Sequence, residues 1–228
     1  MAIDVELLKA IPYFAGLEEA DLEAVKQRMF EQSVERNDMV LIEGDPAEAV
    51  YFVVSGAVKV FKTSIEGKEQ ILCLVRAGES FNDVPVLDGG PNIASAIAMT
   101  PAVLYGMTKT DIESLLREDP GVAMNMIKVL SKKVRHFVDL VEDLSFRDVT
   151  SRVAKLLLEY AVDHSVAEEG TPRPRLTQQE MAAMVGTARE VVGRSLKTLE
   201  EEGAIRMDRH RIVVVNKKAL EQMGGVVQ

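Results

Sequence analysis

The stretch at residues 176–205, LTQQEMAAMVGTAREVVGRSLKTLEEEGAI, carries the strongest structural signal in the sequence. Two Thr-x-x-Glu pairs, which begin at Thr177 and Thr187, have the spacing of a capping box, in which side chains satisfy the free backbone N–H groups at the start of a helix. Between the two predicted helices lies Gly186, where a tight turn needs a residue that tolerates positive φ. The stretch therefore predicts a helix-turn-helix.

Both predicted helices have an apolar face that can pack into a small core. These faces consist of Met181, Met184 and Val185 on the first helix and Val191, Val192, Leu196 and Leu199 on the second. Gly203 ends the second helix, and the segment 205–216, IRMDRHRIVVVN, has the pattern of two short strands around a polar turn. Together these features predict a winged helix-turn-helix.

The first turns of the second helix carry side chains that suit DNA. A recognition helix presents its N-terminal residues to the major groove. Arg189 and Arg194 can each form two hydrogen bonds with guanine, and Glu190 can accept one from cytosine or serve only as a helix cap. The predicted DNA-contacting residues are Arg189, Glu190, Arg194, Lys197, Thr177, Gln178, Thr187 and Arg209. Arg206, His210 and Arg211 of the wing are further candidates for phosphate contacts, with a solvated turn as the alternative.

Charge is distributed unevenly along the chain. The whole sequence has 27 Lys and Arg against 36 Asp and Glu, a net charge of −9. Residues 1–147 hold 15 basic and 24 acidic residues, whereas residues 148–228 hold 12 of each, so the excess of acidity lies in the first part. A neutral domain can still bind DNA when its positive residues gather on one face. The acidic remainder is expected to limit non-specific binding and to make affinity depend strongly on salt.

The first half of the chain predicts a β-rich domain. Residues 4–30 are expected to form short helices, one of them at 21–30. From there to about residue 108, short β-branched runs alternate with Gly, Pro, Asp and Asn, which is typical of an antiparallel sandwich or barrel. A short helix then ends at Pro120.

A long helix is predicted from about Gly121 to Phe146. Its apolar residues recur at alternating intervals of three and four, the pattern of a coiled-coil seam. The seam consists of Ile127, Leu130, Val134, Phe137, Val141 and Leu144. Charged residues flank this narrow stripe, which favours pairing with a second copy of the chain. We therefore expect a homodimer, with packing of a single helix on its own barrel as the alternative.

Three segments resemble the cyclic AMP receptor protein / fumarate–nitrate reductase regulator (CRP/FNR) superfamily. They are the helix-turn-helix stretch, LSFRDVTSRVAKLLLEYA at 144–161, and EGDPAEAVYFVVSGAVKVFK at 43–62. The resemblance covers nearly the whole chain. It implies an α+β fold with an N-terminal cyclic-nucleotide-binding-type β-barrel (a jelly roll), a long dimerisation helix and a C-terminal winged helix-turn-helix. It also implies a homodimeric transcription regulator whose barrels sense a ligand and reposition two DNA-binding heads.

The resemblance also bears on partners. The Arg189-Glu190 pair followed by Arg194 matches the cyclic AMP receptor branch, which implies double-stranded DNA with palindromic half-sites resembling TGTGA. The oxygen-sensing branch differs at these positions. The polar loop SVAEEGTPRP at 165–174 lies where family members often touch RNA polymerase, so that enzyme is a further expected partner.

The effector pocket departs from the family pattern. The family holds its cyclic phosphate with a Gly-Glu pair and an Arg-Ser pair. Asn82 and Asp83 stand near the first pair here, and Ile93 and Ala94 stand where the second is expected. Without the arginine, a buried phosphate lacks its charge partner. We therefore do not expect cyclic AMP to be the effector.

What replaces cyclic AMP is open. The predicted pocket residues are Asn82, Asp83, Val84, Ile93, Ala94, Phe137 and Val138. A largely apolar cavity of this kind could hold haem, as in gas sensors of the superfamily, and His136 is the only histidine near it. The pocket-loop histidine of the carbon monoxide sensors is missing, and the ordinary interpretation of His136 is a helix residue that makes a polar contact. A regulator that is active without an effector is the other alternative.

The remaining features exclude several classes of protein. Cys73 is the only cysteine, so no internal disulfide is possible; we expect a buried, unreactive thiol, with a redox switch as the alternative. An enzymatic barrel would need a cluster of His and carboxylate ligands, and the barrel region contains no histidine, so no enzymatic activity is expected. The sequence lacks a signal peptide and a membrane-spanning run, which predicts a cytoplasmic protein without membrane partners.

The sequence is therefore divided into three predicted parts. An effector-sensing β-barrel domain is expected at 1–120, the dimerisation helix with its hinge at 121–147, and the winged helix-turn-helix at 148–228.

Overall fold

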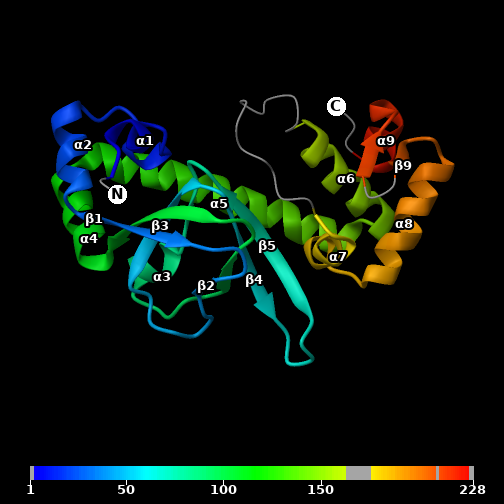
Figure 1. Cartoon of the computed structure of the whole chain (residues 1–228), viewed down its shortest axis with the longest axis horizontal. Coiled ribbons are helices and arrows are strands. Elements are labelled where there is room, and N and C mark those ends of the chain that lie inside the picture. Colours follow the sequence, from blue (N-terminus) through cyan, green and yellow to red (C-terminus); the bar gives the residue numbers. More distant parts are fainter. Residues whose placement is uncertain (1–2, 163–175, 209–210, 226–228) are drawn as a thin grey trace. The chain divides into compact units, whose positions relative to one another are not determined.

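The computed structural model describes residues 3–162, 176–208 and 211–225 of the chain. By its internal contacts the chain divides into two compact units. The first contains Met1–Ser64 and Ile71–His136, and the second contains Ile65–Gln70 and Phe137–Gln228. Figure 1 shows the order of the helices and strands along the chain.

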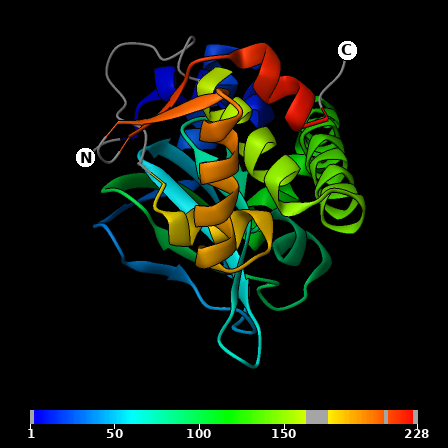
Figure 2. The ribbon, with the colours of Figure 1, turned by 90° about the vertical axis from the view of Figure 1, so that its right-hand side faces the viewer.

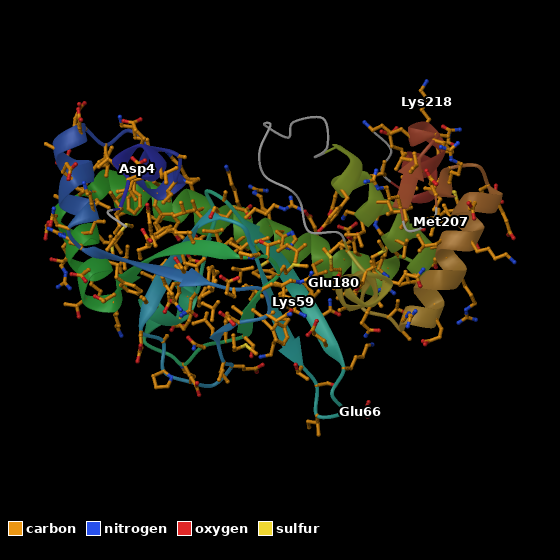
Figure 3. All side chains as sticks on the ribbon, viewed as in Figure 1. Asp4, Lys59, Glu66, Glu180, Met207 and Lys218 are labelled. Carbon is orange, nitrogen blue, oxygen red and sulfur yellow. The ribbon has the colours of Figure 1, made fainter. Side chains whose placement is uncertain are left out.

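Three short helical elements open the first unit. They are α1 (Val5–Lys9), the 3-10 helix η1 (Pro12–Phe14) and α2 (Glu19–Lys26). Asp4, labelled in Figure 3, caps α1 because its carboxylate accepts a hydrogen bond from the backbone N–H of Glu6 at 2.9 Å. The predicted helix at 21–30 was wrong at its end, where Met29 and Phe30 already belong to the first strand. Pairing with a distant strand overrides the local helical pattern there.

Eight strands follow and form two four-stranded sheets of antiparallel pairs, as the sequence predicted. The strands are β1 (Met29–Val34), β2 (Met39–Leu41), β3 (Ala49–Ser55), β4 (Ala57–Thr63), β5 (Glu69–Arg76), β6 (Ser80–Phe81), β7 (Ser95–Ala98) and β8 (Ala102–Thr108). One sheet has the order β1-β8-β3-β6, and the other has the order β2-β7-β4-β5. Register pairs such as Met29 with Met107 join distant parts of the sequence. This arrangement is the predicted jelly-roll-type barrel.

Two apolar clusters fill the first unit. One joins the N-terminal helices, the first sheet and the start of the long helix, and includes Leu8, Phe14, Phe52, Met107, Ile112 and Val122. The other is built from both sheets, and includes Val53, Val58, Val75, Phe81, Ala96 and Leu104. Burial of these side chains supplies the main favourable free energy for folding this unit.

Three helices accompany the barrel in sequence: α3 (Asp83–Asp88), α4 (Lys109–Glu118) and α5 (Pro120–Phe146). The predicted long helix is thus confirmed as α5, which has 27 residues. Pro120 suits its first position because that residue needs no backbone N–H donor and has a helical φ. Within α5, Val122 and Met126 are buried, and most of the later residues are exposed.

The second unit contains the C-terminal helices and the wing. Its elements are α6 (Val149–Val162), α7 (Gln178–Val185), α8 (Arg189–Glu201), the strands β9 (Ile205–Asp208) and β10 (Arg211–Val214), and α9 (Lys217–Met223). Figure 2 faces α8, in orange, with the wing strands and α9. Their shared core includes Val153, Met181, Leu196, Leu199, Ile205 and Leu220. Helix α9 was not predicted; Asn216 caps it by accepting from the N–H of Ala219 at 3.1 Å.

Candidate functional site

Helices α7 and α8 form the helix-turn-helix that the sequence predicted. Thr177 begins α7 with a complete capping box: its hydroxyl accepts from the N–H of Glu180 at 3.1 Å, and the Glu180 carboxylate accepts from the N–H of Thr177 at 2.6 Å. Figure 3 labels Glu180 at this helix start. Gly186 ends α7 with a φ of +67°, and a Cβ there would lie 2.6 Å from Cδ2 of Leu144. The left-handed backbone conformation therefore favours glycine at this position, and an added side chain would have to displace the end of the Leu144 side chain.

The second predicted capping box was wrong. Within residues 176–208, which the structure describes throughout, the N-cap of α8 is Ala188, and it makes no side-chain capping bond. The N–H of Thr187 donates to the carbonyl of Ala182 at 2.9 Å, so Thr187 still belongs to the end of α7. Glu190 consequently lies in the first turn of α8 without a capping role. A carboxylate is favoured there by the helix dipole.

Helix α8 separates a buried face from an exposed one. Its buried residues are Val192, Ser195, Leu196 and Leu199. The predicted base-reading residues are exposed: Arg189, Glu190, Arg194 and Lys197. Positions 190, 194 and 197 are four and three residues apart, so their side chains share one helix face. An exposed polar face of this kind at the start of α8 suits insertion into the major groove.

Helix α6 supports both helices of the motif. Arg152 donates through Nη1 to the carbonyl of Val185, the last residue of α7. The hydroxyl of Thr150 donates to Oγ of Ser195 at 3.1 Å, and Ser195 is buried on α8. These two polar contacts fix the direction in which α8 presents its exposed face.

The wing is tied to α8 by one described hydrogen bond. The N–H of Met207, labelled in Figure 3, donates to Oε1 of Glu200 at 2.7 Å. Arg206 and Arg211 are exposed on the two wing strands, where phosphate contacts were expected. The predicted contact Arg209 lies outside the described residues.

The other predicted positions near the motif are only partly described. Thr177 is exposed and Gln178 is partly exposed at the start of α7. His210 and the loop at 165–174 lie outside the described residues.

The first unit contains a buried carboxylate with three partners. Asp83, at the start of α3, is 4% exposed. Its Oδ1 accepts from the hydroxyl of Ser80 at 2.8 Å and from the phenol of Tyr13, and its Oδ2 accepts from Nζ of Lys133 on α5. Burial, together with this carboxylate, raises the pKa of Tyr13 far above its ordinary value, so its phenol remains a donor. Asp83 was predicted to lie in the pocket, but its three partners were not predicted; Ser80 is a near neighbour in sequence, whereas Tyr13 and Lys133 are distant.

The neighbouring pocket residues have mixed surroundings. Asn82 adopts a left-handed conformation with a φ of +66°, and its side-chain amide donates to the carbonyl of Ala49 at 3.1 Å. Ala94 is buried, whereas Val84 and Ile93 are exposed. Phe137 and Val138 are exposed on α5 and belong to the second unit. The apolar pocket that these residues were expected to share therefore stays a prediction.

The two residues considered for haem or redox chemistry have ordinary surroundings. His136 Nε2 lies 3.2 Å from the carbonyl oxygen of Leu72 on β5. Burial raises the pKa of the Cys73 thiol to about 11, which disfavours the reactive thiolate at neutral pH. Among the described residues, no group of three or more His, Cys, Asp or Glu side chains is placed to hold a metal ion.

Most of the predicted seam of α5 is exposed, although Leu130 packs against the apolar core of the first unit. Five of its six residues, Ile127, Val134, Phe137, Val141 and Leu144, have exposed fractions between 39% and 63%, and Leu130 is intermediate. Isolated exposed apolar residues are common, but a regular stripe of them on one helix indicates a surface that packs against another protein.

The two units match two known domain families. Residues 31–119 match the cyclic nucleotide-binding domain, and residues 151–223 match the Crp-like helix-turn-helix domain. Together with the structure, they define a DNA-binding regulator with a cyclic-nucleotide-binding-type barrel. Among the described helices, none has the length and apolar content needed to span a bilayer.

Whole-chain relatives make the assignment specific. The chain is 34% identical to the cyclic AMP receptor protein of Thermus thermophilus, over 95% of this chain and 98% of the relative. It is 29% identical to a CRP-like cAMP-activated global transcriptional regulator of Mycobacterium tuberculosis, over 94% and 97%. The structure of FixK2 from Bradyrhizobium japonicum superposes with a TM-score of 0.73 at 27% identity, covering 86% of this chain and 96% of that one. The protein belongs to the CRP/FNR family of transcription regulators.

Proposed function

We propose that the protein acts as a homodimer that binds a specific DNA sequence under the control of a signal sensed in its barrel. The observation that carries the proposal is the exposed apolar seam of α5 in a chain that also exposes the base-reading side chains of α8. When a second helix covers an exposed apolar stripe with this spacing, the burial of apolar surface stabilises the pair of helices. A twofold dimer also presents two recognition helices to a palindrome.

The proposed target is double-stranded DNA with two half-sites resembling TGTGA. Arg189, Glu190 and Arg194 lie in the first two turns of α8 and are exposed, as readout of guanine and cytosine requires. The centres of the two half-sites should lie about one turn of DNA apart, roughly 34 Å. RNA polymerase is a further proposed partner, through the segment 165–174, which lies outside the described residues.

For the effector we propose a molecule other than cyclic AMP, although both relatives named above carry that nucleotide in their names. The Asp83 carboxylate, near the family's Gly-Glu position, is already engaged by three side chains. Ile93 and Ala94 bring no charge to the place where a phosphate would need it. A phosphate buried there without a countercharge would be strongly disfavoured.

Calorimetric titration of the purified protein with cyclic AMP tests the effector proposal. We expect no saturable heat, and a parallel hemin titration should give no sharp Soret band because His136 already contacts the carbonyl of Leu72. Saturable binding of one cyclic AMP per chain would overturn the effector proposal while leaving DNA recognition intact. A Soret band that saturates at one haem per chain and changes in His136→Ala would favour the haem alternative.

The substitution Arg194→Ala tests the DNA-reading role of α8. Arg194 is exposed and shares a face with Glu190 and Lys197, so its removal should deprive one base pair of its hydrogen-bond partner. We expect operator affinity to fall by about 1–3 kcal/mol, with relaxed preference at that single position. Fluorescence anisotropy on a set of single-base operator variants measures both effects.

The control is Arg117→Ala on α4, which removes another exposed arginine outside the recognition helix. It should leave affinity unchanged. If Arg194→Ala behaves like this control, Arg194 does not read the operator.

A further inference from the structure

We infer that Lys133 and Asp83 form an internal latch that fixes the rotation of α5 on the barrel and so keeps the seam available for dimerisation and DNA binding. The latch consists of Lys133, Asp83, Ser80 and Tyr13, all of which belong to the first unit. The inference rests on the proposed function, since DNA binding is one of its readouts.

The latch is a closed network of charges and hydrogen bonds. Nζ of Lys133 donates to the carbonyl of Ser80 at 2.9 Å, to the hydroxyl of Ser80 at 3.0 Å and to Oδ2 of Asp83. These contacts use the three donors of the ammonium group. The other carboxylate oxygen accepts from Tyr13 and Ser80. Lys133 thus joins α5 to α3 and β6, and Asp83 extends the network to Tyr13 of η1.

Lys133 lies on the side of α5 that faces the barrel. Val122 and Met126 are buried, and Val129 packs against the same core, so these residues mark the barrel-facing stripe of the helix. The next positions of that stripe, four and seven residues after Val129, are Lys133 and His136. Both are anchored by polar contacts, Lys133 in the latch and His136 at the carbonyl of Leu72. The apolar stripe therefore ends in two directional contacts.

The barrel-facing stripe and the seam are neighbours around the helix. With 3.6 residues per turn, the seam positions lie about 100° from the barrel-facing stripe. Leu130 of the seam already contacts the barrel core, and a purely apolar contact would permit α5 to roll until more of the seam packed there, because hydrophobic packing has little directionality. An ammonium that must reach one buried carboxylate permits only a single rotation. The latch thereby leaves Val134, which is 61% exposed, free to meet a second chain.

The two charged side chains differ in their exposure to water, and this difference makes the latch testable. The Lys133 side chain is 31% exposed, whereas that of Asp83 is 4% exposed. Lys133→Met leaves a buried carboxylate without its countercharge, while Asp83→Asn leaves an ammonium that water can still reach. The double variant removes both charges together, so the two changes should not add.

The experiment measures the dimer dissociation constant and operator affinity for Lys133→Met, Asp83→Asn and the double variant. Each single variant should weaken operator binding at least about fivefold, because the binding-competent rotation is less populated. The double variant should bind the operator at least as tightly as the single variant that binds it less well. Lys132→Met, at an exposed neighbouring position outside both stripes, should stay within about twofold of the unmodified protein. Far-UV circular dichroism verifies folding, and if Lys133→Met does not fold, Asp83→Asn and the double variant decide the question.

The outcomes separate the latch from the proposed function. If the unmodified protein binds no DNA, the proposed function fails and the dimer dissociation constants alone judge the latch. If the unmodified protein binds DNA and the latch variants bind equally well or more tightly, the latch is overturned. The latch is also overturned if the fold loss of operator affinity in the double variant equals the product of the losses in the two single variants.

Discussion

Val134→Asp should convert the proposed dimer into monomers and remove most of the operator affinity. Val134 lies in the middle of the exposed seam, so a twofold dimer would bury two aspartates near each other without a countercharge. We expect the dimer dissociation constant to rise at least about 100-fold, since an uncompensated buried charge costs about 3–5 kcal/mol. Operator affinity should fall with it because the two half-sites are then bound independently. Sedimentation velocity over a concentration series measures the first effect, and anisotropy measures the second.

Val134→Asp should leave the fold of each chain intact. Val134 is mostly exposed within its own chain, so the far-UV circular dichroism should be unchanged. Lys132→Gln is the matched control, because it changes the net charge by the same amount at an exposed position on the opposite side from the seam. Equal dimerisation by Val134→Asp and this control would favour the alternative in which α5 pairs with nothing but its own barrel.

Gly56→Val should strongly destabilise the barrel. Gly56 lies in the turn between β3 and β4 with a φ of +82°, and a Cβ there would lie 2.4 Å from the carbonyl oxygen of Pro101 and 2.7 Å from Cβ of Ala102. The left-handed conformation costs about 1–2 kcal/mol for an ordinary residue and more for a β-branched one. Overpacking adds about 1–3 kcal/mol. We therefore expect the free energy of unfolding of the first unit to fall by at least about 3 kcal/mol.

Urea denaturation followed by tyrosine fluorescence measures the effect of Gly56→Val. The chain has four tyrosines and no tryptophan, and Tyr13, Tyr51 and Tyr105 lie in the first unit. The control is Gly44→Val: Gly44 has a φ of +89°, but a Cβ there meets nothing within 4 Å. That variant should show only the backbone cost. Equal destabilisation by both substitutions would show that the contact with Pro101 and Ala102 is unimportant.

The elements predicted best from the sequence are those with strong local rules. The capping box at Thr177, the glycine turn at Gly186 and the long helix all depend on residues close in sequence. The sequence-based prediction was wrong where a residue fits two local patterns, or where pairing with a distant strand decides its conformation. Thr187 has the spacing of a helix cap, but its N–H completes the end of α7 instead. The start of β1 has a helical sequence pattern, but its pairing with β8 makes it a strand.

The latch could not be predicted from the sequence. Tyr13, Ser80, Asp83 and Lys133 come from four elements. Ser80 and Asp83 are close in sequence, but nothing in the spacing brings Tyr13 and Lys133 to them. One signal was present: Lys133 falls four residues after Val129, at a position where a barrel-facing stripe calls for an apolar side chain. A charged residue on an otherwise apolar helix face indicates a buried partner, although the identity of that partner needs the fold.

The most direct test of the central claim is a selection of binding sites from random double-stranded DNA with the purified, unmodified protein. We expect enrichment of a palindrome whose half-sites resemble TGTGA and whose centres lie about one helical turn apart. Recovery of sequences without twofold symmetry, or of no enriched sequence at all, would contradict a dimer that reads DNA through α8.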